Sequence, residues 1–410
     1  MTAPAPLGGV TIAIIGGCGH VGLPLGVKLA LAGAETRLVD VNEKAVATVN
    51  GGRFPFLERD GDTQLSRALE CGLRATSDPS VCAEAEVLVF VTGTPVDEHL
   101  NPKLSEVLRI FEAYDEYFAP GKLLVMRSTL FPGTMDYLNE RLNRCHPGVR
   151  IAFCPERICQ GYALEEIDTL PQIVASFDDE SFEAACDLFS ALAPKIIRLT
   201  PLEAELAKLM TNSWRYLEFA IANQFYLIAE SRGVDFRRVY KAIKLDYPRA
   251  AGYKAPGFAA GPCLFKDTMQ LASFFDNRFY LGHSAMLVNE GLASFVAYKV
   301  KRELGGALWG RTVGLLGMTF KPDNDDTRDS LSFKVKKLLE FEGARVLCAD
   351  PYAPDCDPIE RVLVESDAIV LSTPHAEYRG LKVEKPLIDV WGILDDPEID
   401  VRETGRGSAS

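Results

Sequence analysis

The stretch TIAIIGGCGHVG, residues 11–22, sets the fold of the N-terminal part of this chain. Its first five residues are apolar or β-branched, as in a buried strand, and glycines follow at once. Counted from Gly17, these glycines form the pattern G-x-G-x-x-G. The pattern predicts a strand, a tight glycine turn and a helix in succession, which is how a parallel α/β sheet begins.

The acid that ends the next predicted strand indicates what the glycine loop binds. Asp40 lies 23 residues after Gly17, at the end of the strand Thr36–Asp40. A carboxylate there can accept hydrogen bonds from a ribose diol and would repel a 2′-phosphate, so we predict NAD rather than NADP. The alternative is that the glycines serve only the turn. The residues expected to contact the cofactor are Gly17, Cys18, Gly19, His20, Val21, Gly22 and Asp40.

Strand and helix patterns alternate in the first and last parts of the chain. The first set of predicted strands is Val10–Ile15, Thr36–Asp40, Glu86–Val91, Lys122–Arg127, Arg150–Cys154 and Lys195–Leu199. Apolar positions then take a helical spacing from Leu202 to Gly233, and helix continues to Leu304. Strands return at Thr312–Gly317, Arg345–Asp350, Ala368–Thr373 and Pro386–Val390.

These patterns predict an α/β protein with two Rossmann-like, doubly wound domains joined by a central domain of long helices. We expect the NAD-binding domain at 1–199, the helical domain at 200–304, the second α/β domain at 305–400 and a flexible tail at 401–410. The sheet of the first domain is expected to be parallel. The second α/β domain lacks a full G-x-G-x-x-G, so no dinucleotide is expected there.

Composition excludes several classes of partner. The 410 residues include 44 Lys and Arg against 57 Asp and Glu, a formal charge of −13, which argues against general binding to nucleic acid or to an anionic membrane. The ten cysteines have no C-x-x-C spacing and indicate reduced thiols in a cytoplasmic protein. No membrane-spanning segment is expected, and the five scattered histidines predict no metal site.

Two further segments could carry chemistry. In PGFAAGPCLFKD, residues 256–267, Cys263 follows a Gly-Pro loop at the predicted start of a helix, where the helix N-terminus and a nearby lysine favour a nucleophilic thiolate. The alternative is a small buried hydrophobe. Lys208 and Asn212 lie four residues apart on the long helix and could donate to a developing oxyanion, or could simply face solvent.

Six ordered segments together resemble the UDP-glucose/GDP-mannose dehydrogenase family of nucleotide-sugar 6-dehydrogenases, from about residue 10 to 395. They are the glycine loop, STLFPGT (128–134), CPER (154–157), ELAKLMTN (205–212), the Cys263 loop, and FKPD (320–323) through DTRDS (326–330). The resemblance implies a four-electron oxidation. The primary alcohol at carbon 6 of a nucleotide-linked hexose becomes a carboxylate, and two NAD⁺ are reduced.

The resemblance also implies residue roles. Cys263 would bond to the aldehyde as a thiohemiacetal and then hold a thioester, because the thiol turns a carbonyl into a species that can donate hydride. Lys208 and Asn212 would stabilise the charged oxygen, and Asp267 would activate the hydrolytic water. Thr129 would sit beside that water and Glu156 near the reacting carbon. Further expected contacts are Thr94 and Thr129 with NAD, and Glu156, Arg157, Lys208, Arg249, Lys254, Gly261, Lys321 and Arg328 with the UDP-sugar.

Departures from the commoner family pattern bear on the substrate. Pro262 precedes the cysteine and removes an N–H, and Gln160 stands where glucose-oxidising relatives often carry a second glutamate. The Pro-Glu-Arg form resembles the branch acting on UDP-N-acetylmannosamine or UDP-N-acetylglucosamine. The alternatives are a UDP-glucose 6-dehydrogenase, a single-step hydroxy-acid dehydrogenase of the 6-phosphogluconate type, and a non-catalytic nucleotide-sugar sensor.

The long helix also predicts self-association. Segment 202–233 is apolar on more than one face, with bulky side chains at Trp214, Tyr216, Leu217 and Phe219. Such a helix buries more surface than its own domain can cover. We therefore expect a homodimer through the central helical domain.

Overall fold

The computed structural model describes residues 5–93, 103–394 and 397–402. The chain divides into two compact units. Unit 1 comprises residues 1–212 with 266–279, and unit 2 comprises residues 213–265 with 280–410. The predicted boundaries at 199 and 304 stay predictions, because this division passes through the long helices and does not set them apart as a domain.

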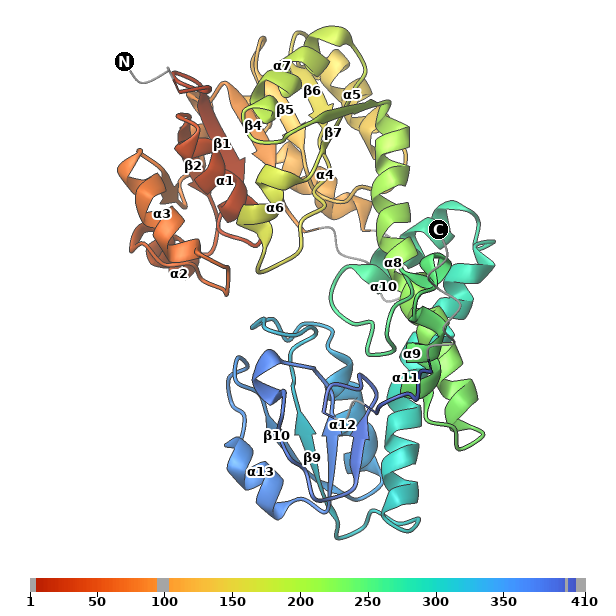
Figure 1. The fold of residues 1–410 in the computed structure, drawn as a ribbon. Coiled ribbons are helices and arrows are strands. Elements are labelled where there is room, and N and C mark those ends of the chain that lie inside the picture. Colours follow the sequence, from red (N-terminus) through yellow and green to blue (C-terminus); the bar gives the residue numbers. More distant parts are fainter. Residues whose placement is uncertain (1–4, 94–102, 395–396, 403–410) are drawn as a thin grey trace, which may run out of the picture. The chain divides into compact units, whose positions relative to one another are not determined.

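Unit 1 is built on a sheet whose strand order is β3-β2-β1-β4-β5-β6-β7-β8 (Figure 1). The strands are β1 (Thr11–Ile15), β2 (Glu35–Val39), β3 (Arg74–Thr76), β4 (Val87–Phe90), β5 (Leu123–Met126), β6 (Arg150–Phe153), β7 (Gln172–Ser176) and β8 (Ile196–Leu199). All six predicted strands of this part are confirmed, whereas β3 and β7 were not predicted. The expectation of a fully parallel sheet is wrong at one place, because β7 pairs antiparallel with β6.

Helices cover both faces of this sheet. Along β1, Ile12 and Ile14 enter one core while Ala13 and Ile15 enter the other, as the alternation of a strand requires. The helices of unit 1 that precede the long ones are α1 (Gly22–Leu31), α2 (Glu43–Asn50), α3 (Gly61–Glu70), α4 (Leu104–Glu112), α5 (Thr134–Cys145), α6 (Ala163–Thr169) and α7 (Asp179–Ser190). Side chains of α1, α3, α6 and α7 fill the first core, and those of α4 and α5 fill the second. The sheet is therefore doubly wound, as predicted.

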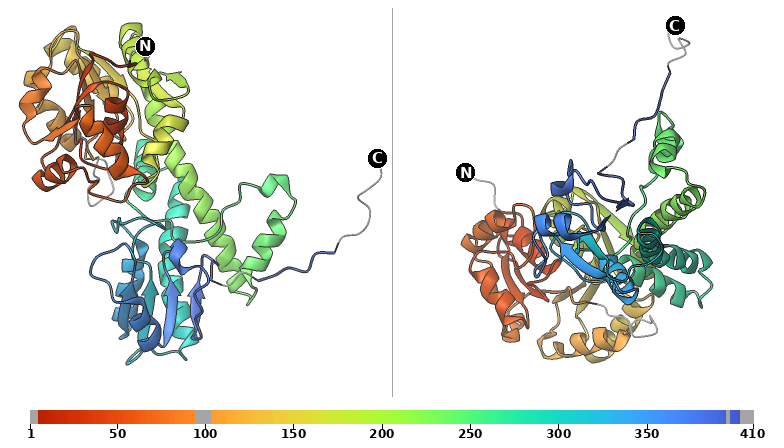
Figure 2. Two further views of the ribbon diagram at one scale, coloured as in Figure 1. Left: turned by 60° about the vertical axis from the view of Figure 1, so that its left-hand side comes forward. Right: turned by 90° about the horizontal axis from the view of Figure 1, so that it is seen from below.

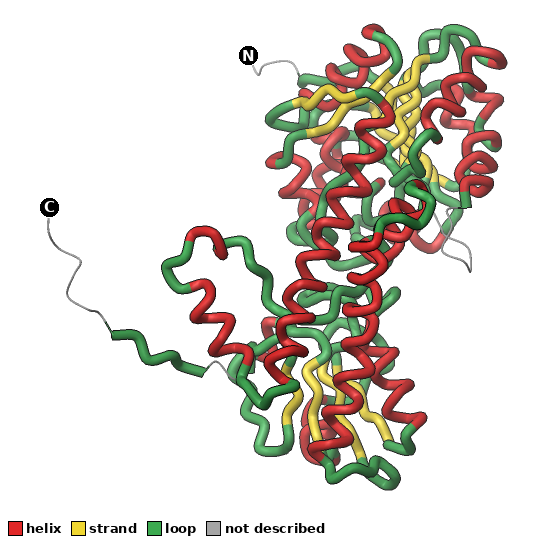
Figure 3. Tube along the Cα trace, turned by 90° about the vertical axis from the view of Figure 1, so that its right-hand side faces the viewer, coloured by secondary structure: helices red, strands yellow, loops and turns green. Residues whose placement is uncertain are grey.

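The predicted helical stretch is confirmed as α8 (Pro201–Glu230), α9 (Phe236–Lys244), α10 (Leu264–Phe274) and α11 (Tyr280–Glu303) (Figure 3). Helix α8 runs for 30 residues. It ends just before Gly233, whose φ of +67° allows the left-handed turn that closes a helix. Short 3₁₀ turns occur at Pro79–Ala83, Asp115–Tyr117, Pro248–Ala250 and Ala376–Tyr378.

Unit 2 contains a second sheet, of strand order β10-β9-β11-β12, with every pair parallel (Figure 2). Its strands are β9 (Thr312–Leu316), β10 (Arg345–Ala349), β11 (Ala368–Leu371) and β12 (Leu387–Asp389), and its remaining helices are α12 (Leu331–Phe341) and α13 (Ile359–Glu365). Side chains of α11 and α12 cover one face and those of α13 the other. The predicted fold class, with two doubly wound sheets and long helices between them in sequence, is confirmed.

Some expectations concern the ends and surface of the chain. Of the predicted tail 401–410, only residues 401 and 402 are described, and neither is in a helix or strand. Among the described residues, no helix combines the length and apolar character needed to cross a membrane. None of the ten cysteines, all in described parts of the chain, forms a disulfide.

Candidate active site

The glycine loop after β1 contains two glycines that the packing of the chain requires and one that it does not. A Cβ on Gly17 would lie 2.7 Å from the Ile14 carbonyl oxygen, and a Cβ on Gly22 would lie 2.6 Å from the Gly16 oxygen. Among the described residues, a Cβ on Gly19 would meet only the Gly16 oxygen, at an ordinary 3.7 Å. The packing of the chain does not itself require Gly19, whereas close approach of a pyrophosphate to the backbone does. The loop therefore fits a dinucleotide.

Asp40 is held beside this loop. It directly follows β2, its Oδ2 accepts the Cys18 N–H at 3.0 Å, and its Oδ1 accepts the Asn42 N–H at 3.0 Å. Burial, and then the charge of Asp40, raise the pKa of the Cys18 thiol to about 12, so this cysteine is no nucleophile. The ring of His20 lies 4.0 Å from that of Phe56. The other expected NAD contact, Thr94, lies outside the described residues.

The loop 128–134 follows β5 and carries Thr129. Ser128 anchors its start by donating from Oγ to the Thr92 carbonyl at 2.6 Å. Thr129 itself is half-buried, and Gly133 ends the loop with a φ of +94° before α5 begins. The loop thus lies at the carboxyl end of a central strand, where ligands of doubly wound sheets bind.

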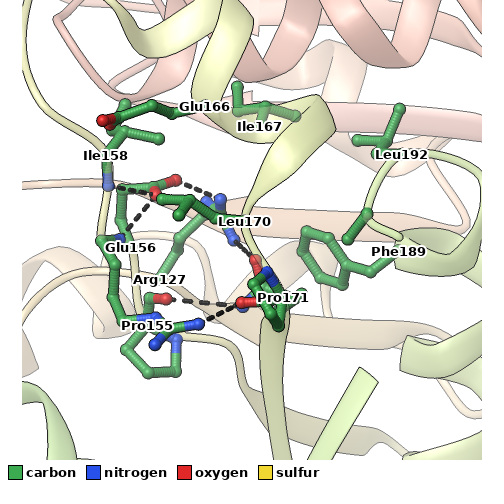
Figure 4. Close-up of a pocket in the computed structure, with 13 residues that line it drawn as sticks. Arg127, Pro155, Glu156, Ile158, Glu166, Ile167, Leu170, Pro171, Phe189 and Leu192 are labelled. Atoms are coloured by element: carbon green, nitrogen blue, oxygen red, sulfur yellow. Dashed lines mark hydrogen bonds and ion pairs between the residues drawn. The ribbon is translucent and has the colours of Figure 1, made fainter. Parts of the chain in front are cut away.

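The Pro-Glu-Arg segment is held by a buried polar network (Figure 4). Glu156 pairs with Arg127 through Oε2, while its Oε1 accepts the N–H groups of Arg157 and Ile158 at 2.6 and 2.9 Å. Arg127 also donates to Gln172 Oε1 at 3.0 Å. One oxygen of Glu156 therefore binds its own loop, and the other binds the arginine that follows β5.

Sequence reasoning missed Arg127 and Gln172, which hold that segment. Arg127 directly follows β5, also donates to the Cys154 carbonyl at 3.1 Å, and is only 2% exposed. The guanidinium of Arg157 donates to the Pro171 carbonyl. A basic residue at the end of an apolar strand was the available signal, since a buried charge needs partners.

Two predicted catalytic residues meet in unit 1. Asn212 Nδ2 donates to Asp267 Oδ2 at 2.6 Å, and both side chains are buried. The other oxygen, Oδ1, accepts no hydrogen bond within the described part of the chain and lies 3.7 Å from Lys266 Nζ. Lys208, half-buried, lies one helical turn before Asn212. The structure thus pairs Asn212 with one oxygen of Asp267, while the other oxygen accepts no hydrogen bond from the described residues.

Cys263 is exposed and directly precedes α10, which confirms its predicted place at a helix start. The loop before it is fixed in unit 2. Gly261 has a φ of +97°, its N–H donates to the Asp329 carbonyl at 3.2 Å, and a Cβ there would lie 2.5 Å from the Phe320 ring. The Cys263 loop therefore packs directly on the segment 320–330.

A buried amide pair, also missed from sequence, ties the same loop to α8 and α11. Asn223 donates to the Gly257 carbonyl at 3.0 Å and accepts the Gly257 N–H at 2.8 Å. It also donates to Asn289 Oδ1 at 2.9 Å, and Asn289 donates in turn to the Tyr216 carbonyl at 3.0 Å. Both asparagines are fully buried, so the loop is held by a satisfied polar network.

The cations expected to meet the UDP-sugar differ in their surroundings. Arg328 donates from Nε and Nη2 to the two oxygens of Asp326, and these bonds raise the pKa of Arg328. A thiolate at Cys263 would also interact electrostatically with this arginine. Arg249 is exposed on the turn Pro248–Ala250, where its Nε donates to the Tyr247 hydroxyl at 2.8 Å. Lys254 is exposed on the segment that leads to the Cys263 loop, and Lys321 is half-buried. All four side chains can meet an anion, and Arg328 also interacts with Cys263.

In unit 2, Asp350 follows β10 as Asp40 follows β2. Its carboxylate accepts the Met318 and Thr319 N–H groups at 2.5 and 3.0 Å and pairs with His375 Nε2 at 3.0 Å. Burial alone would raise its pKa, but the hydrogen bonds from His375 and the backbone hold the pKa well below its usual range. Asp350 thus anchors the loop that follows β9.

No three His, Cys, Asp or Glu side chains within residues 5–93, 103–394 and 397–402 are grouped to hold a metal ion.

Comparison with known proteins identifies the family. Residues 10–193 match the NAD binding domain of the UDP-glucose/GDP-mannose dehydrogenase family, residues 202–290 its central domain, and residues 314–396 its UDP binding domain. A UDP-N-acetyl-D-mannosamine dehydrogenase from Methanocaldococcus jannaschii is 30% identical over 92% of this chain and 88% of that protein. This chain belongs to the UDP-glucose/GDP-mannose dehydrogenase family. The predicted family and NAD cofactor are confirmed, and the protein is an NAD-dependent oxidoreductase.

Other members of the UDP-glucose/GDP-mannose dehydrogenase family are similar over almost the whole chain. A UDP-N-acetyl-D-mannosamine dehydrogenase from Pyrococcus horikoshii is 30% identical over 97% of this chain and 99% of that protein. The solved structure of a UDP-glucose dehydrogenase from Pyrobaculum islandicum superposes with a TM-score of 0.89 at 26% identity, covering 97% of each chain. The names of these relatives differ in the sugar.

Proposed function

We propose that this protein oxidises the carbon-6 alcohol of a UDP-linked 2-acetamido hexose, such as UDP-N-acetylmannosamine, to a carboxylate. The observation that best supports the proposal lies at the start of α10. An exposed cysteine directly precedes the helix, and a buried aspartate held by Asn212 lies in its first turn. The names of the relatives from Methanocaldococcus jannaschii and Pyrococcus horikoshii, together with Gln160, support the 2-acetamido sugar.

The proposed role of Cys263 follows from the electron balance. The alcohol carbon would give up two hydrides in turn and gain one oxygen from water; NAD⁺, held by the glycine loop and Asp40, would supply the hydride acceptor. After the first loss the carbon is an aldehyde, and Cys263 Sγ adds to it while the oxygen takes a proton. The resulting thiohemiacetal carbon keeps one hydrogen; its departure as hydride, together with loss of the hydroxyl proton, leaves a thioester. Attack by water then breaks the carbon–sulfur bond and returns the thiol.

The Asn212–Asp267 pair fits the hydrolytic step. Asn212 fixes one carboxylate oxygen at 2.6 Å, so the other oxygen keeps a set direction in which to accept a proton from water. Lys208, one turn away on the same helix, would donate to the oxygen that bears charge in the adduct. Thr129 would lie beside the water.

We also infer that the protein works as a homodimer in the cytoplasm. Helix α8 exposes Trp214, Ile221, Phe225 and Ile228, whose spacing of seven, four and three places them on one stripe. A stripe of this kind is stabilised by a second copy of the same helix. The ten cysteines without a disulfide support a reducing compartment.

The test is a substrate panel with a count of NADH. UDP-N-acetylmannosamine, UDP-N-acetylglucosamine, UDP-glucose and GDP-mannose are each incubated with NAD⁺, and NADH and sugar acid are both quantified. We expect two NADH per acid with a UDP-2-acetamido sugar, and no acid from Cys263→Ala. Cys71→Ala, which alters another exposed cysteine, is the matched control and should keep full activity. One NADH per product, or an active Cys263→Ala, would contradict the proposal.

UDP-glucose is the second candidate substrate, because the superposed structure from Pyrobaculum islandicum is that of a UDP-glucose dehydrogenase. The thioester chemistry would be the same for this sugar. A higher kcat/KM for UDP-glucose than for either 2-acetamido sugar in the same panel would select it.

A further inference from the structure

Helix α5 begins without a cap from its own sequence. The residue at its N-cap is Gly133, which has no side chain to accept the first free N–H groups. The Gly133 N–H donates instead to Oε2 of Glu205 at 2.7 Å, and the Met135 N–H donates to Oε1 at 2.9 Å. Glu205 lies about 70 residues later in the chain, on α8. A different helix therefore caps α5.

The carboxylate of Glu205 is completely buried, with 0% of the residue exposed. Burial is the main cause that raises the pKa of Glu205 to about 7. The charge of Asp136 on α5 adds to this increase, whereas the hydrogen bonds from Gly133 and Met135 oppose it. The positive end of the α5 dipole also favours the ionised form. Glu205 therefore changes its charge within the neutral pH range, unlike an exposed glutamate.

The contacts of Glu205 join the elements that carry three proposed catalytic residues. The loop that it caps contains Thr129, while Lys208 and Asn212 follow Glu205 by three and seven residues on its own helix. Asn212 in turn holds Asp267 of α10. Phe131 of the loop also contacts Phe274 of α10, with ring centroids 5.9 Å apart. Loop 128–134, α8 and α10 thus form a closed set of contacts within unit 1.

We propose that Glu205 is a positioning residue whose ionised carboxylate fixes the Thr129 loop against the turn of α8 that bears Lys208 and Asn212. The proposal rests on the proposed function, which assigns those three residues. An ionised carboxylate accepts from both N–H groups, whereas a protonated one turns an O–H toward one of them and loses that bond. The contact is therefore complete only in the ionised state.

The kinetic test compares Glu205→Gln with the wild type across pH 5.5 to 8.5. Glutamine has a similar size but keeps only one acceptor, so we expect kcat to fall by about 10- to 100-fold at pH 8 with a smaller change in KM. The ratio of wild-type to variant kcat should shrink as pH falls through about 7, because the wild type then loses the same contact. A ratio that does not change with pH would overturn the proposal.

Glu203→Gln is the matched control. Glu203 is exposed on the same helix and bonds only to Thr200 in the described residues, so the substitution removes a similar charge without touching the loop. We expect its kcat to stay near that of the wild type at every pH. A pH-dependent loss equal to that of Glu205→Gln would show a general effect of charge on α8 and would overturn the proposal.

Hydrogen exchange at the Gly133 and Met135 amides gives a readout that needs no substrate. We expect these amides to exchange at least about tenfold faster in Glu205→Gln than in Glu203→Gln, and in the wild type to lose protection below pH 7 after correction for intrinsic rates. The wild-type measurement holds even if Glu205→Gln does not fold. Unchanged protection across this range would overturn the proposal. Faster exchange in a protein that oxidises no UDP-sugar would refute the proposed function and leave the cap established.

Discussion

The two oxygens of Asp267 have different surroundings, and this difference gives the residue its expected role. One oxygen is fixed by Asn212, and the other accepts no hydrogen bond from the described residues and lies 3.7 Å from Lys266 Nζ. Asp267→Asn should keep the shape of the side chain but remove the base. We expect acid formation to fall by about 10²- to 10⁴-fold, while the thioester accumulates on Cys263. Mass spectrometry of the protein after incubation with NAD⁺ and the UDP-sugar would detect the adduct.

Asp276→Asn is the control for this experiment. Asp276 lies exposed beyond the end of α10, with a φ of +50° that asparagine also adopts readily. The Asp276→Asn variant should form the sugar acid at the wild-type rate. Wild-type acid formation by Asp267→Asn would contradict the assignment of Asp267 as the base in the hydrolytic step.

Gly261 is the residue at which the Cys263 loop is most sensitive to a side chain. Its left-handed φ and the closeness of Phe320 both oppose a Cβ. Gly261→Ala should therefore lower the free energy of unfolding of unit 2 by about 1–3 kcal/mol and reduce acid formation. Urea unfolding followed by fluorescence, with a parallel NADH assay, would measure both effects.

Gly252→Ala provides the comparison, because a Cβ at Gly252 meets nothing within 4 Å. Its unfolding midpoint should stay close to that of the wild type. Equal midpoints for the two alanine variants would show that the loop adapts to a Cβ at Gly261.

Single residues also mark the limit of prediction from sequence. Cys263 could be placed at a helix start because proline and glycine before it interrupt the chain locally. Nothing local connects Arg127 with Glu156, which lie 29 residues apart yet share a buried ion pair. The pairing of one Glu156 oxygen with Arg127 depends on tertiary structure. The predicted place of Glu156 near the reacting carbon stays a prediction.

At the scale of elements, apolar runs located most strands, and the exceptions have physical reasons. Strand β3 is only the three residues Arg74–Thr76, too short for any alternation to show. Strand β7 follows Pro171 and begins with Gln172, whose side-chain oxygen accepts a hydrogen bond from Arg127. Its antiparallel pairing with β6 depends on how the chain returns to the sheet edge, which local periodicity does not encode.

The loop after β9 depends on the buried Asp350 carboxylate. Its folded pKa lies below the unfolded value near 3.9, so its contribution to stability is present above about pH 4 and is lost as pH falls toward the folded pKa. Asp350→Asn should cost about 1–3 kcal/mol at pH 7, and the cost should shrink below pH 4. Chemical unfolding of both proteins at several pH values would measure this trend.

Asp355→Asn is a suitable control, since Asp355 is exposed and has a φ of +60° that asparagine tolerates. We expect no pH-dependent difference from the wild type there. A cost for Asp350→Asn that stays constant from pH 7 to pH 3 would show that its charge is unimportant.

At the scale of the whole molecule, the α8 stripe predicts the state of assembly. Replacing Trp214 and Phe225 together by glutamate would place two charges in the proposed interface, where they lack partners. We expect the double variant to be monomeric by light scattering at concentrations where the wild type is dimeric. Phe341→Glu, at an exposed position on another helix, should leave the assembly unchanged. A dimeric double variant would exclude this interface.

The cap on α5 also affects the order in which the protein folds during synthesis. A nascent chain that has emerged only as far as Leu199 already contains all eight strands of its first sheet. It still lacks Glu205, so the N–H groups that open α5 have no carboxylate to receive them. The Thr129 loop can form its contacts with Glu205 only after the first turns of α8 have left the ribosome. A fragment that ends at residue 199 would lack these contacts.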